Sequence, residues 1–150
     1  HLVRYIEQKP FCEPLAFYHE LNSRVFLLKL TPGMSPLILK DIFSQYDGII
    51  VESFGVGGLP GGDDGAMFAA VRDWCGAGHL AVFTTQVPHE GSDLAVYEVG
   101  RAAKALPGVL EAHDMTPEAT AVKLMWVLGQ TTDRAEAEKL FLTPVQWDIL

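Results

Sequence analysis

Three polar or glycine-rich segments of the sequence hold the residues that could do chemistry. They cover residues 52–62, 84–91 and 113–116, and each follows a short apolar run with strand character. In an open parallel sheet, ligands bind beyond the carboxyl ends of the strands. We therefore expect the three segments to meet at one edge of a sheet, where any ligand site of the chain would lie.

The first segment has the glycine spacing that begins a dinucleotide-binding loop. Gly55 and Gly57 fit that spacing, but Pro60 stands where the third glycine permits close packing of helix on strand. The sequence contains no Gly-Lys-Ser or Gly-Lys-Thr of a phosphate loop. A nucleophile elbow at Ser53 would need glycine where Val51 stands. We interpret the segment as a flexible turn that lets another chain or a ligand approach.

The histidines give no pattern typical of a metal site. They are His1, His19, His79, His89 and His113, and no two have ligand spacing on a shared helix, which argues against zinc. His113 precedes Asp114, a candidate capping residue, and we expect a satisfied loop histidine there. His89 beside Glu90 could titrate near neutral pH, but a solvated pair explains it. No cofactor is expected.

Two charged or aromatic residues of the predicted helices are informative. Lys123 is the only charge in an otherwise mostly apolar helix, and we expect it to extend its ammonium to solvent. Tyr97 lies, in helical geometry, about 160° from an apolar stripe, with Leu94 on its own side. The stripe consists of Ala95, Val99, Ala102, Ala103 and Leu106. An outward tyrosine and leucine indicate contact with another body, since tyrosine combines apolar area with a hydrogen-bonding tip.

The elements that must position these residues alternate along the chain. Strands are expected at residues 25–30, 48–51, 80–84 and 109–111. Three of these runs are almost continuously apolar, which is typical of strands covered on both faces. Helices are expected to begin at Ser35 with Pro36 in the first turn, near Met67, at Ser92 or Asp93, at Thr116, and at Thr132 or Asp133. The alternation predicts an α/β fold: a small three-layer, Rossmann-like domain with a parallel four-stranded sheet flanked by helices.

Composition and charge limit the function classes. Of the 150 residues, 49% are apolar and 20% are charged, which fits one globular domain and excludes disorder. The net charge is −8, and no basic cluster that could displace counterions from phosphate is present, which argues against nucleic acid as a partner. No apolar run approaches the roughly 20 residues of a membrane span. Glu7, Gln8 and Lys9 interrupt the start of the chain, where a signal peptide would be apolar.

The cysteines and the first residue bear on location and domain organisation. Cys12 and Cys75 form neither a disulfide framework nor a redox pair, so we expect free thiols in a reducing, cytoplasmic compartment. The chain begins with His1 rather than Met, so we expect a processed chain or a piece of a longer one. Residues 1–22 have no clear period and are expected to be a linker or lead-in to a domain at 23–150.

Several strings of the sequence together resemble one family. The strings cover residues 22–34, 48–60, 84–86, 93–101, 114–116 and 123–126, in the family's order and at consistent spacing. They are similar to the C-terminal domain of L-asparaginases of the cytoplasmic, bacterial type I and archaeal kind. The resemblance runs from about residue 22 to residue 142.

The resemblance implies a two-domain α/β enzyme of which these residues are the second domain. The full enzyme would hydrolyse asparagine to aspartate and ammonia. A threonine hydroxyl would attack the amide carbon to form an acyl-enzyme, from which water would release aspartate. An oxyanion site would stabilise the tetrahedral intermediate. The family carries its catalytic threonines in Thr-Gly-Gly-Thr and His-Gly-Thr-Asp-Thr segments of the N-terminal domain, and neither string occurs in the 150 residues. Thr132 and Asp133 are followed by Arg134 and do not substitute. We expect no amidase activity from these residues alone.

The resemblance also suggests residues for a site. The C-terminal domain of the family contributes the subunit contacts of a dimer or tetramer. It also forms the far wall of a neighbouring subunit's pocket, and Tyr97 matches a tyrosine that lies there in archaeal relatives. Some bacterial relatives bind asparagine allosterically near the first two segments through an arginine and a cysteine, where this chain has Glu52 and Val87. Glutamate in place of arginine would repel the ligand's carboxylate. The possible allosteric or interface loop comprises Glu52, Ser53, Thr85, Gln86 and Val87.

Two alternatives remain open from the sequence. The asparaginase-like subunit of archaeal glutamyl-tRNA amidotransferase has the same two-domain body and would differ in sequence upstream of His1. A stand-alone module of Rossmann-like shape that binds a small molecule would have no catalytic partner domain. Tight binding of asparagine or aspartate by the 150 residues alone would favour the module.

Overall fold

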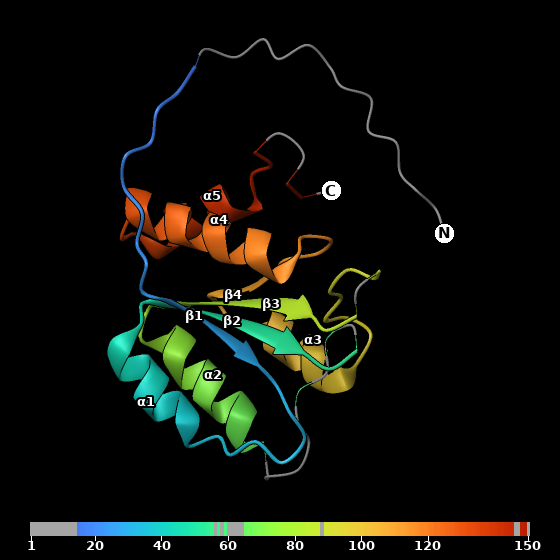
Figure 1. The fold of residues 1–150 in the computed structure, drawn as a ribbon. Helices are drawn as coiled ribbons and strands as arrows, with labels where there is room; N and C mark the ends of the chain where they lie inside the picture. Colours follow the sequence, from blue (N-terminus) through green and yellow to red (C-terminus); the bar gives the residue numbers. More distant parts are fainter. Residues whose placement is uncertain are drawn as a thin grey trace.

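The computed structural model describes residues 15–55, 57, 59, 65–87, 89–145, 148 and 149. Within them, four strands form one sheet in the order β1-β2-β3-β4, and each pairs with its neighbour in parallel. The strands are β1 (Val25–Lys29), β2 (Gly48–Ser53), β3 (Leu80–Thr85) and β4 (Val109–Glu111). Because all four run in the same direction, their carboxyl ends meet at one edge of the sheet (Figure 1).

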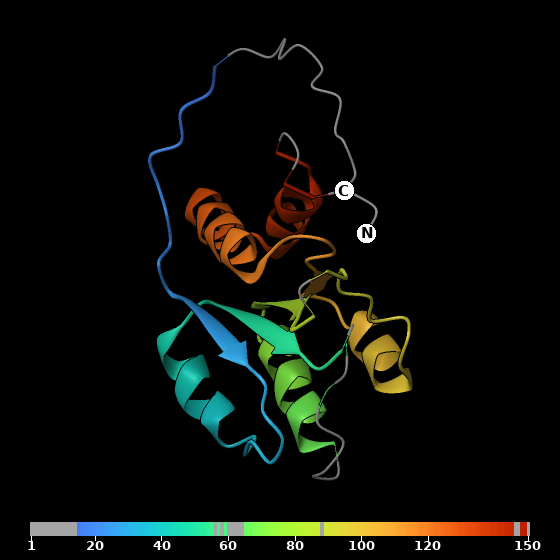
Figure 2. The same ribbon diagram turned by 45° about the vertical axis from the view of Figure 1, so that its right-hand side comes forward.

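Helices cover both faces of the sheet, which gives three layers. The helices α1 (Ile38–Gln45), α2 (Ala66–Gly76) and α3 (Glu98–Lys104) lie on one face, and α4 (Pro117–Gln130) and α5 (Arg134–Leu142) lie on the other (Figures 1 and 2). The predicted α/β class and the parallel four-stranded sheet are therefore confirmed. The predicted strands also agree with the observed ones to within two residues.

The core explains why the two central strands are continuously apolar. Every residue of β2 and β3 is buried, because each strand has a neighbour on both sides and helices on both faces. Alternate side chains enter two clusters. One cluster, which includes Val51 and Phe83, packs with Leu39 of α1 and Trp74 of α2. The other, which includes Ile50, packs under α4 and α5.

Side-chain caps fix the starts of the two C-terminal helices, as predicted. The Thr116 hydroxyl accepts a hydrogen bond from Ala119 N at 3.2 Å, with Pro117 in the first turn of α4. The Asp133 carboxylate accepts one from Glu136 N at 2.8 Å. Each cap satisfies a backbone donor that the helix itself leaves unpaired.

Two predicted helix starts are wrong. The first helix begins at Ile38 rather than at Ser35, because residues 35–37 form a turn in which the Ser35 hydroxyl accepts a hydrogen bond from Leu37 N at 3.3 Å. The third helix begins at Glu98, and the Asp93 carboxylate instead closes a short turn by accepting a bond from Ala95 N at 2.9 Å. Aspartate side chains favour such turns as readily as helix caps.

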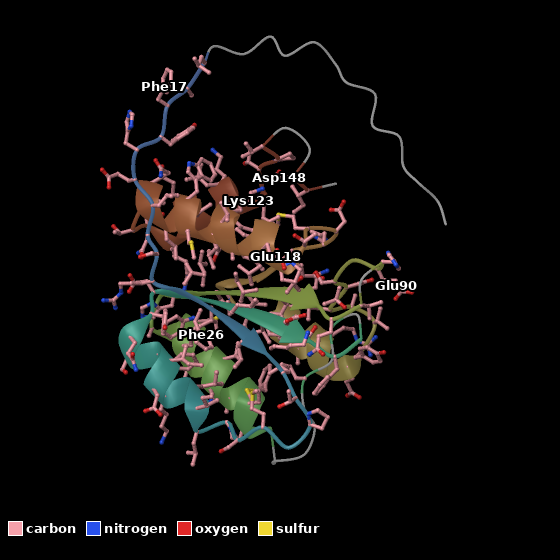
Figure 3. The ribbon with its side chains drawn as sticks, in the orientation of Figure 1. Phe17, Phe26, Glu90, Glu118, Lys123 and Asp148 are labelled. Atoms are coloured by element: carbon pink, nitrogen blue, oxygen red, sulfur yellow. The ribbon has the colours of Figure 1, made fainter. Side chains whose placement is uncertain are left out.

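The expectation that Lys123 extends to solvent is also wrong. Its side chain is 4% exposed, and its ammonium lies 2.8 Å from Asp148 Oδ2 and donates to Thr143 O at 3.0 Å. Figure 3 shows Lys123 of α4 and Asp148 near each other. The ammonium also lies 5.5 Å from the centre of the Phe141 ring, within the range of a cation–π contact. The lysine therefore ties the end of the chain to α4.

The described part of the predicted lead-in, residues 15–22, forms no helix or strand and lies beside α4. Asn22 N donates to Met125 O at 2.9 Å, and the Tyr18 and Trp126 rings meet edge to face with centres 5.1 Å apart. Residues 1–14 lie outside the described residues. The division into a lead-in and a domain at 23–150 stays a prediction.

Candidate functional site

The three segments singled out in the sequence do meet at the carboxyl edge of the sheet. Thr85, the last residue of β3, donates a short hydrogen bond from Oγ1 to Gly55 O in the first segment. Ser92 N donates to His113 O in the third segment at 2.7 Å. These contacts join loops that are far apart in the sequence into one surface, which we call the carboxyl-edge surface (residues 52–55, 84–87, 89–97 and 111–116). We take it as the candidate site.

Glu52 lies at the start of this surface in an ion pair. Its Oε1 is 2.7 Å from Lys29 Nζ, and its side chain is 11% exposed, whereas that of Lys29 is 59% exposed. The two residues are partners in the register of β1 and β2, so the strand pairing itself brings them together. A buried carboxylate needs such a partner, because loss of hydration is otherwise uncompensated.

Gln86 joins the ends of three strands. Its Nε2 donates to Leu30 O at 2.8 Å and to Glu52 O at 2.9 Å, and its backbone N donates to Ser53 O at 3.2 Å. Both donors of the amide are thus used within the scaffold. The bonds continue the sheet beyond its last regular residues.

Ser53, Thr85 and Val87 complete the predicted allosteric or interface loop. Ser53 Oγ donates to Thr84 O at 2.8 Å, and Thr85 Oγ1 accepts from Val87 N at 3.0 Å. The structure therefore brings together all five residues proposed from the sequence. It also shows that their hydroxyl and amide groups bind the backbone and that the Glu52 carboxylate binds Lys29.

Gly57 of the first segment lies against residues 93 and 94, which follow the second segment. A Cβ built on Gly57 would lie 2.9 Å from Asp93 O and 3.1 Å from Leu94 Cα. One built on Gly100, in the first turn of α3, would lie 2.4 Å from Leu94 O. Of the described glycines of the first segment, Gly57 therefore lies against the 93–94 backbone and Gly55 against the Tyr97 side chain. That another chain or a ligand also approaches this turn stays a prediction. Residues 56, 58 and 60–64 lie outside the described residues.

Tyr97 is half-exposed and packs over Gly55. A Cβ on Gly55 would lie 3.3 Å from the Tyr97 hydroxyl, so the phenol tip occupies the space that a side chain would take. Tyr97 is the extended residue that precedes α3, with φ −105° and ψ 147°. The helical derivation of its outward position is wrong, because Leu94 is fully buried while Ala95 and Ala102 of the supposed inner stripe are exposed. Tyr97 itself is nevertheless 47% exposed.

Glu111 is a site residue that sequence reasoning missed. Its Oε2 accepts from Leu94 N at 2.8 Å, and its Oε1 lies 2.6 Å from Lys104 Nζ, while its side chain is 6% exposed. The hydrogen bond to Glu111 and the negative charge raise the pKa of Lys104 above its ordinary value. The signal available in the sequence is a glutamate within a short predicted strand, and the strand pairing aligns it with the apolar Phe83 of β3.

Other candidate groups are exposed on this surface or lie away from it. His113 is exposed, with φ 51°, and His89 and Glu90 are both exposed (Glu90 is labelled in Figure 3). Cys75 is a buried free thiol in α2, and burial raises its pKa to about 11. Within the described ranges, no three histidine, cysteine or acidic side chains are grouped so that they could hold a metal ion. In that same part of the chain, no helix is both long and apolar enough to cross a membrane.

A hollow of about 320 Å³ lies at the opposite, amino edge of the sheet. It is lined in part by Asp47, His79, Asp133 and Arg134. The Asp47 carboxylate already binds Arg24 at 3.1 Å and Asn22 at 2.9 Å, and that of Asp133 caps α5. Its acids are thus engaged in the scaffold, and the carboxyl-edge surface remains the stronger candidate.

Comparison with known proteins places the chain in a family. Residues 24–141 match the family model described as the glutaminase/asparaginase C-terminal domain. The chain belongs to this family. It is 44% identical over 128 residues to the L-asparaginase of Thermococcus kodakarensis, covering 85% of this chain and 38% of that protein. It is 38% identical over 125 residues to a glutamyl-tRNA(Gln) amidotransferase subunit of Metallosphaera sedula, covering 83% of this chain and 27% of that protein.

Solved structures agree with the family. The thermostable L-asparaginase from Thermococcus kodakarensis superposes with a TM-score of 0.86 at 40% identity, covering 99% of this chain and 44% of that one. L-asparaginase I from Vibrio cholerae gives 0.74 at 22% identity, covering 97% of this chain and 43% of that one, and shares the fold. The glutaminase/asparaginase C-terminal domain therefore accounts for the described sheet and helices. The chain spans roughly a quarter to two fifths of the length of the curated relatives it matches.

Proposed function

We propose that these residues are the C-terminal domain of an L-asparaginase, the amidohydrolase that converts L-asparagine to L-aspartate and ammonia. The similarity to an L-asparaginase, 44% over 85% of the chain, carries the proposal. The catalytic threonines belong, in this proposal, to a preceding N-terminal domain. The domain described here supplies oligomer contacts in a dimer or tetramer and part of a neighbouring subunit's pocket, and by itself it is inactive.

Tyr97 is the residue that the proposal places in the neighbour's pocket. It lies on the carboxyl-edge surface and is 47% exposed, and Val96 beside it is 52% exposed. A half-exposed tyrosine that keeps its hydroxyl near the backbone of its own domain presents the ring to a partner. Exposed apolar side chains elsewhere, such as Val122 of α4 and Leu142 of α5, are available for further contacts between subunits.

A mixed-oligomer experiment on the full-length protein tests this placement. One chain carries Tyr97→Ala, and the other keeps Tyr97 but has its catalytic threonine replaced. If Tyr97 serves the neighbouring pocket, mixing the two inactive or weakened species restores asparagine hydrolysis, because each intact pocket receives Tyr97 from its partner. As the matched control, both substitutions are put on one chain that is mixed with the unaltered chain. A test mixture no more active than its two species measured separately would place Tyr97 in its own subunit's pocket and contradict the proposal.

The allosteric loop is the second part of the proposal. Glu52 stands where the resemblance has an arginine, and its carboxylate is already paired with Lys29 at 2.7 Å. Val87 has no thiol to replace the cysteine. We therefore propose that the loop of Glu52, Ser53, Thr85, Gln86 and Val87 acts as a structural link between strands rather than as an asparagine site. A sigmoidal dependence of rate on asparagine that Glu52→Gln abolishes would contradict this.

The amidotransferase is the alternative with specific support. Subunits of glutamyl-tRNA(Gln) amidotransferases from several organisms match, with 38% identity for that of Metallosphaera sedula. Ammonia release from free asparagine without tRNA or a second protein favours the asparaginase. A requirement for both favours the amidotransferase. A stand-alone binding module would instead bind asparagine or aspartate tightly with the 150 residues alone, as calorimetry would show.

A cytoplasmic location also belongs to the proposal. The free, buried Cys75 is consistent with a reducing compartment. The solved relatives include a probable cytoplasmic L-asparaginase from Campylobacter jejuni.

A further inference from the structure

Glu111 binds both ends of the segment that carries Tyr97. Leu94, three residues before Tyr97, donates its backbone N–H to Glu111 Oε2 at 2.8 Å. Lys104, the last residue of α3, places its ammonium 2.6 Å from Glu111 Oε1. One carboxylate at the end of β4 therefore fixes the start and the finish of residues 94–104.

The environment of this carboxylate makes the bonds strong. Glu111 is 6% exposed and Leu94 is fully buried, so water cannot replace the bond if it breaks. Hydrogen bonds to an ionised carboxylate are about twice as strong as neutral ones. Removal of the acceptor would leave a buried N–H unpaired, which is more costly than the bond is worth.

Backbone contacts at two glycines confine the same segment. Gly100 and Gly57 leave no room for a Cβ beside Leu94, so the first segment and α3 hold the 94 backbone between them. Gly55 then receives the Tyr97 hydroxyl. With Glu111 bound to Leu94 and Lys104 and the glycines packed against Leu94, Tyr97 has a defined position although the residue is 47% exposed.

We propose that Glu111 is a positioning residue for Tyr97: it acts on the pocket through residues 94–97 and touches no substrate. The inference rests on the proposed function, in which Tyr97 lines a neighbouring asparagine pocket. A merely structural Glu111 would stabilise the domain without affecting how asparagine binds. The two roles therefore differ in what its loss does to KM when the fold is intact.

The experiment uses the full-length protein with two variants of Glu111 and one control. Glu111→Gln keeps an acceptor for Leu94 N but loses the pair with Lys104, and Glu111→Ala loses both. Asp148→Asn is the control, because it breaks a lysine–carboxylate contact of similar length, 2.8 Å, between the end of the chain and α4. All three are compared for hydrogen exchange of the 94–97 amides and for kcat and KM with asparagine, and Glu111→Ala is also made together with Tyr97→Ala.

The proposal predicts a graded, local effect. Exchange of the 94–97 amides rises at least about 10-fold in Glu111→Ala and less in Glu111→Gln, and it stays unchanged in Asp148→Asn. KM rises roughly 10-fold in Glu111→Ala while kcat changes by less than about 2-fold, and this effect vanishes when Tyr97 is already alanine. Unchanged 94–97 exchange, an equal KM effect of Asp148→Asn, or a KM effect that persists without Tyr97 overturns the proposal.

Failure of the proposed function leaves a different signature. If Tyr97→Ala alone leaves kcat and KM unchanged, the role of Tyr97 in the pocket is wrong, and Glu111 then has no pocket residue to position. The exchange measurement does not depend on activity. It still decides whether Glu111 holds residues 94–97.

Discussion

The Tyr97 hydroxyl lies 3.3 Å from the point where a Cβ of Gly55 would stand. Gly55 has φ +51°, a left-handed conformation that costs other residues roughly 1–2 kcal/mol. Two requirements, one of the backbone and one of the neighbouring ring, thus coincide at one glycine. Gly55 therefore leaves the room that the Tyr97 hydroxyl needs, and the hydroxyl fills the space beside Gly55.

Gly55→Ala should therefore destabilise the protein more than backbone strain alone explains. Gly33→Ala is the matched control, because Gly33 has φ +77° and no atom within 4 Å of the added methyl group. We expect Gly33→Ala to lower the free energy of unfolding by about 1 kcal/mol and Gly55→Ala by about 1 kcal/mol more. Urea unfolding measures both. The excess should disappear in a Tyr97→Ala background, and an excess that remains there would contradict the contact.

Gly100→Ala should be among the most destabilising single-methyl changes in the domain. The new Cβ would lie 2.4 Å from Leu94 O, a backbone atom that cannot withdraw without moving the Tyr97 segment. We expect a loss of about 2–4 kcal/mol in the free energy of unfolding. Gly76→Ala, at the end of α2 with nothing within 4 Å, should be neutral or slightly stabilising. Equal unfolding midpoints for the two variants would refute the close packing.

Lys123→Met should weaken the attachment of the chain's end to α4. The ammonium contacts Asp148 at 2.8 Å, and its removal leaves a 24%-exposed carboxylate without its cation. We expect a loss of about 1–3 kcal/mol in the free energy of unfolding, because a partly buried pair is broken but Asp148 can regain some water. Arg72→Met breaks an exposed pair with Asp73 and should change stability by less than about 0.5 kcal/mol. Similar losses in the two variants would show that Lys123 is solvated instead.

Cys75 should be an inert thiol in the folded protein. Burial raises its pKa to about 11, so almost none of the reactive thiolate forms near pH 8. In a Cys12→Ser variant, a thiol reagent should label native Cys75 at least about 100-fold more slowly than the urea-unfolded chain. The folded pKa exceeds the unfolded value near 9, so the unfolded state loses the proton first and stability should fall between about pH 9 and 11. Fast labelling of the native protein would contradict the burial.

Much of the fold follows from local sequence signals. The continuous apolar runs predict β2 and β3, since strands covered on both faces need no alternation. The caps at Thr116 and Asp133 predict the starts of α4 and α5, because each is made by a side chain and an amide only three residues apart.

The rest depends on contacts between distant parts of the chain. Asp93 looks like a helix cap, but Glu111 holds Leu94 in a turn and the helix begins at Glu98. The sequence predicts that Lys123 extends to solvent, but the fold places Asp148 and Thr143 beside its ammonium. Period and spacing carry no information on such partners. The sequence therefore does not point to Glu111, and Gly57 stands out there only through a glycine spacing that resembles a nucleotide-binding loop.

The most direct test of the account is ammonia release from L-asparagine, measured on residues 1–150 alone and on the same residues joined to the N-terminal domain that the proposal expects in the native reading frame. The account predicts no release above the buffer blank from the first. From the second it predicts hydrolysis, with aspartate formed in equal amount. Asparagine turnover by residues 1–150 alone, or an inactive joined protein that binds asparagine only through these residues, would contradict it.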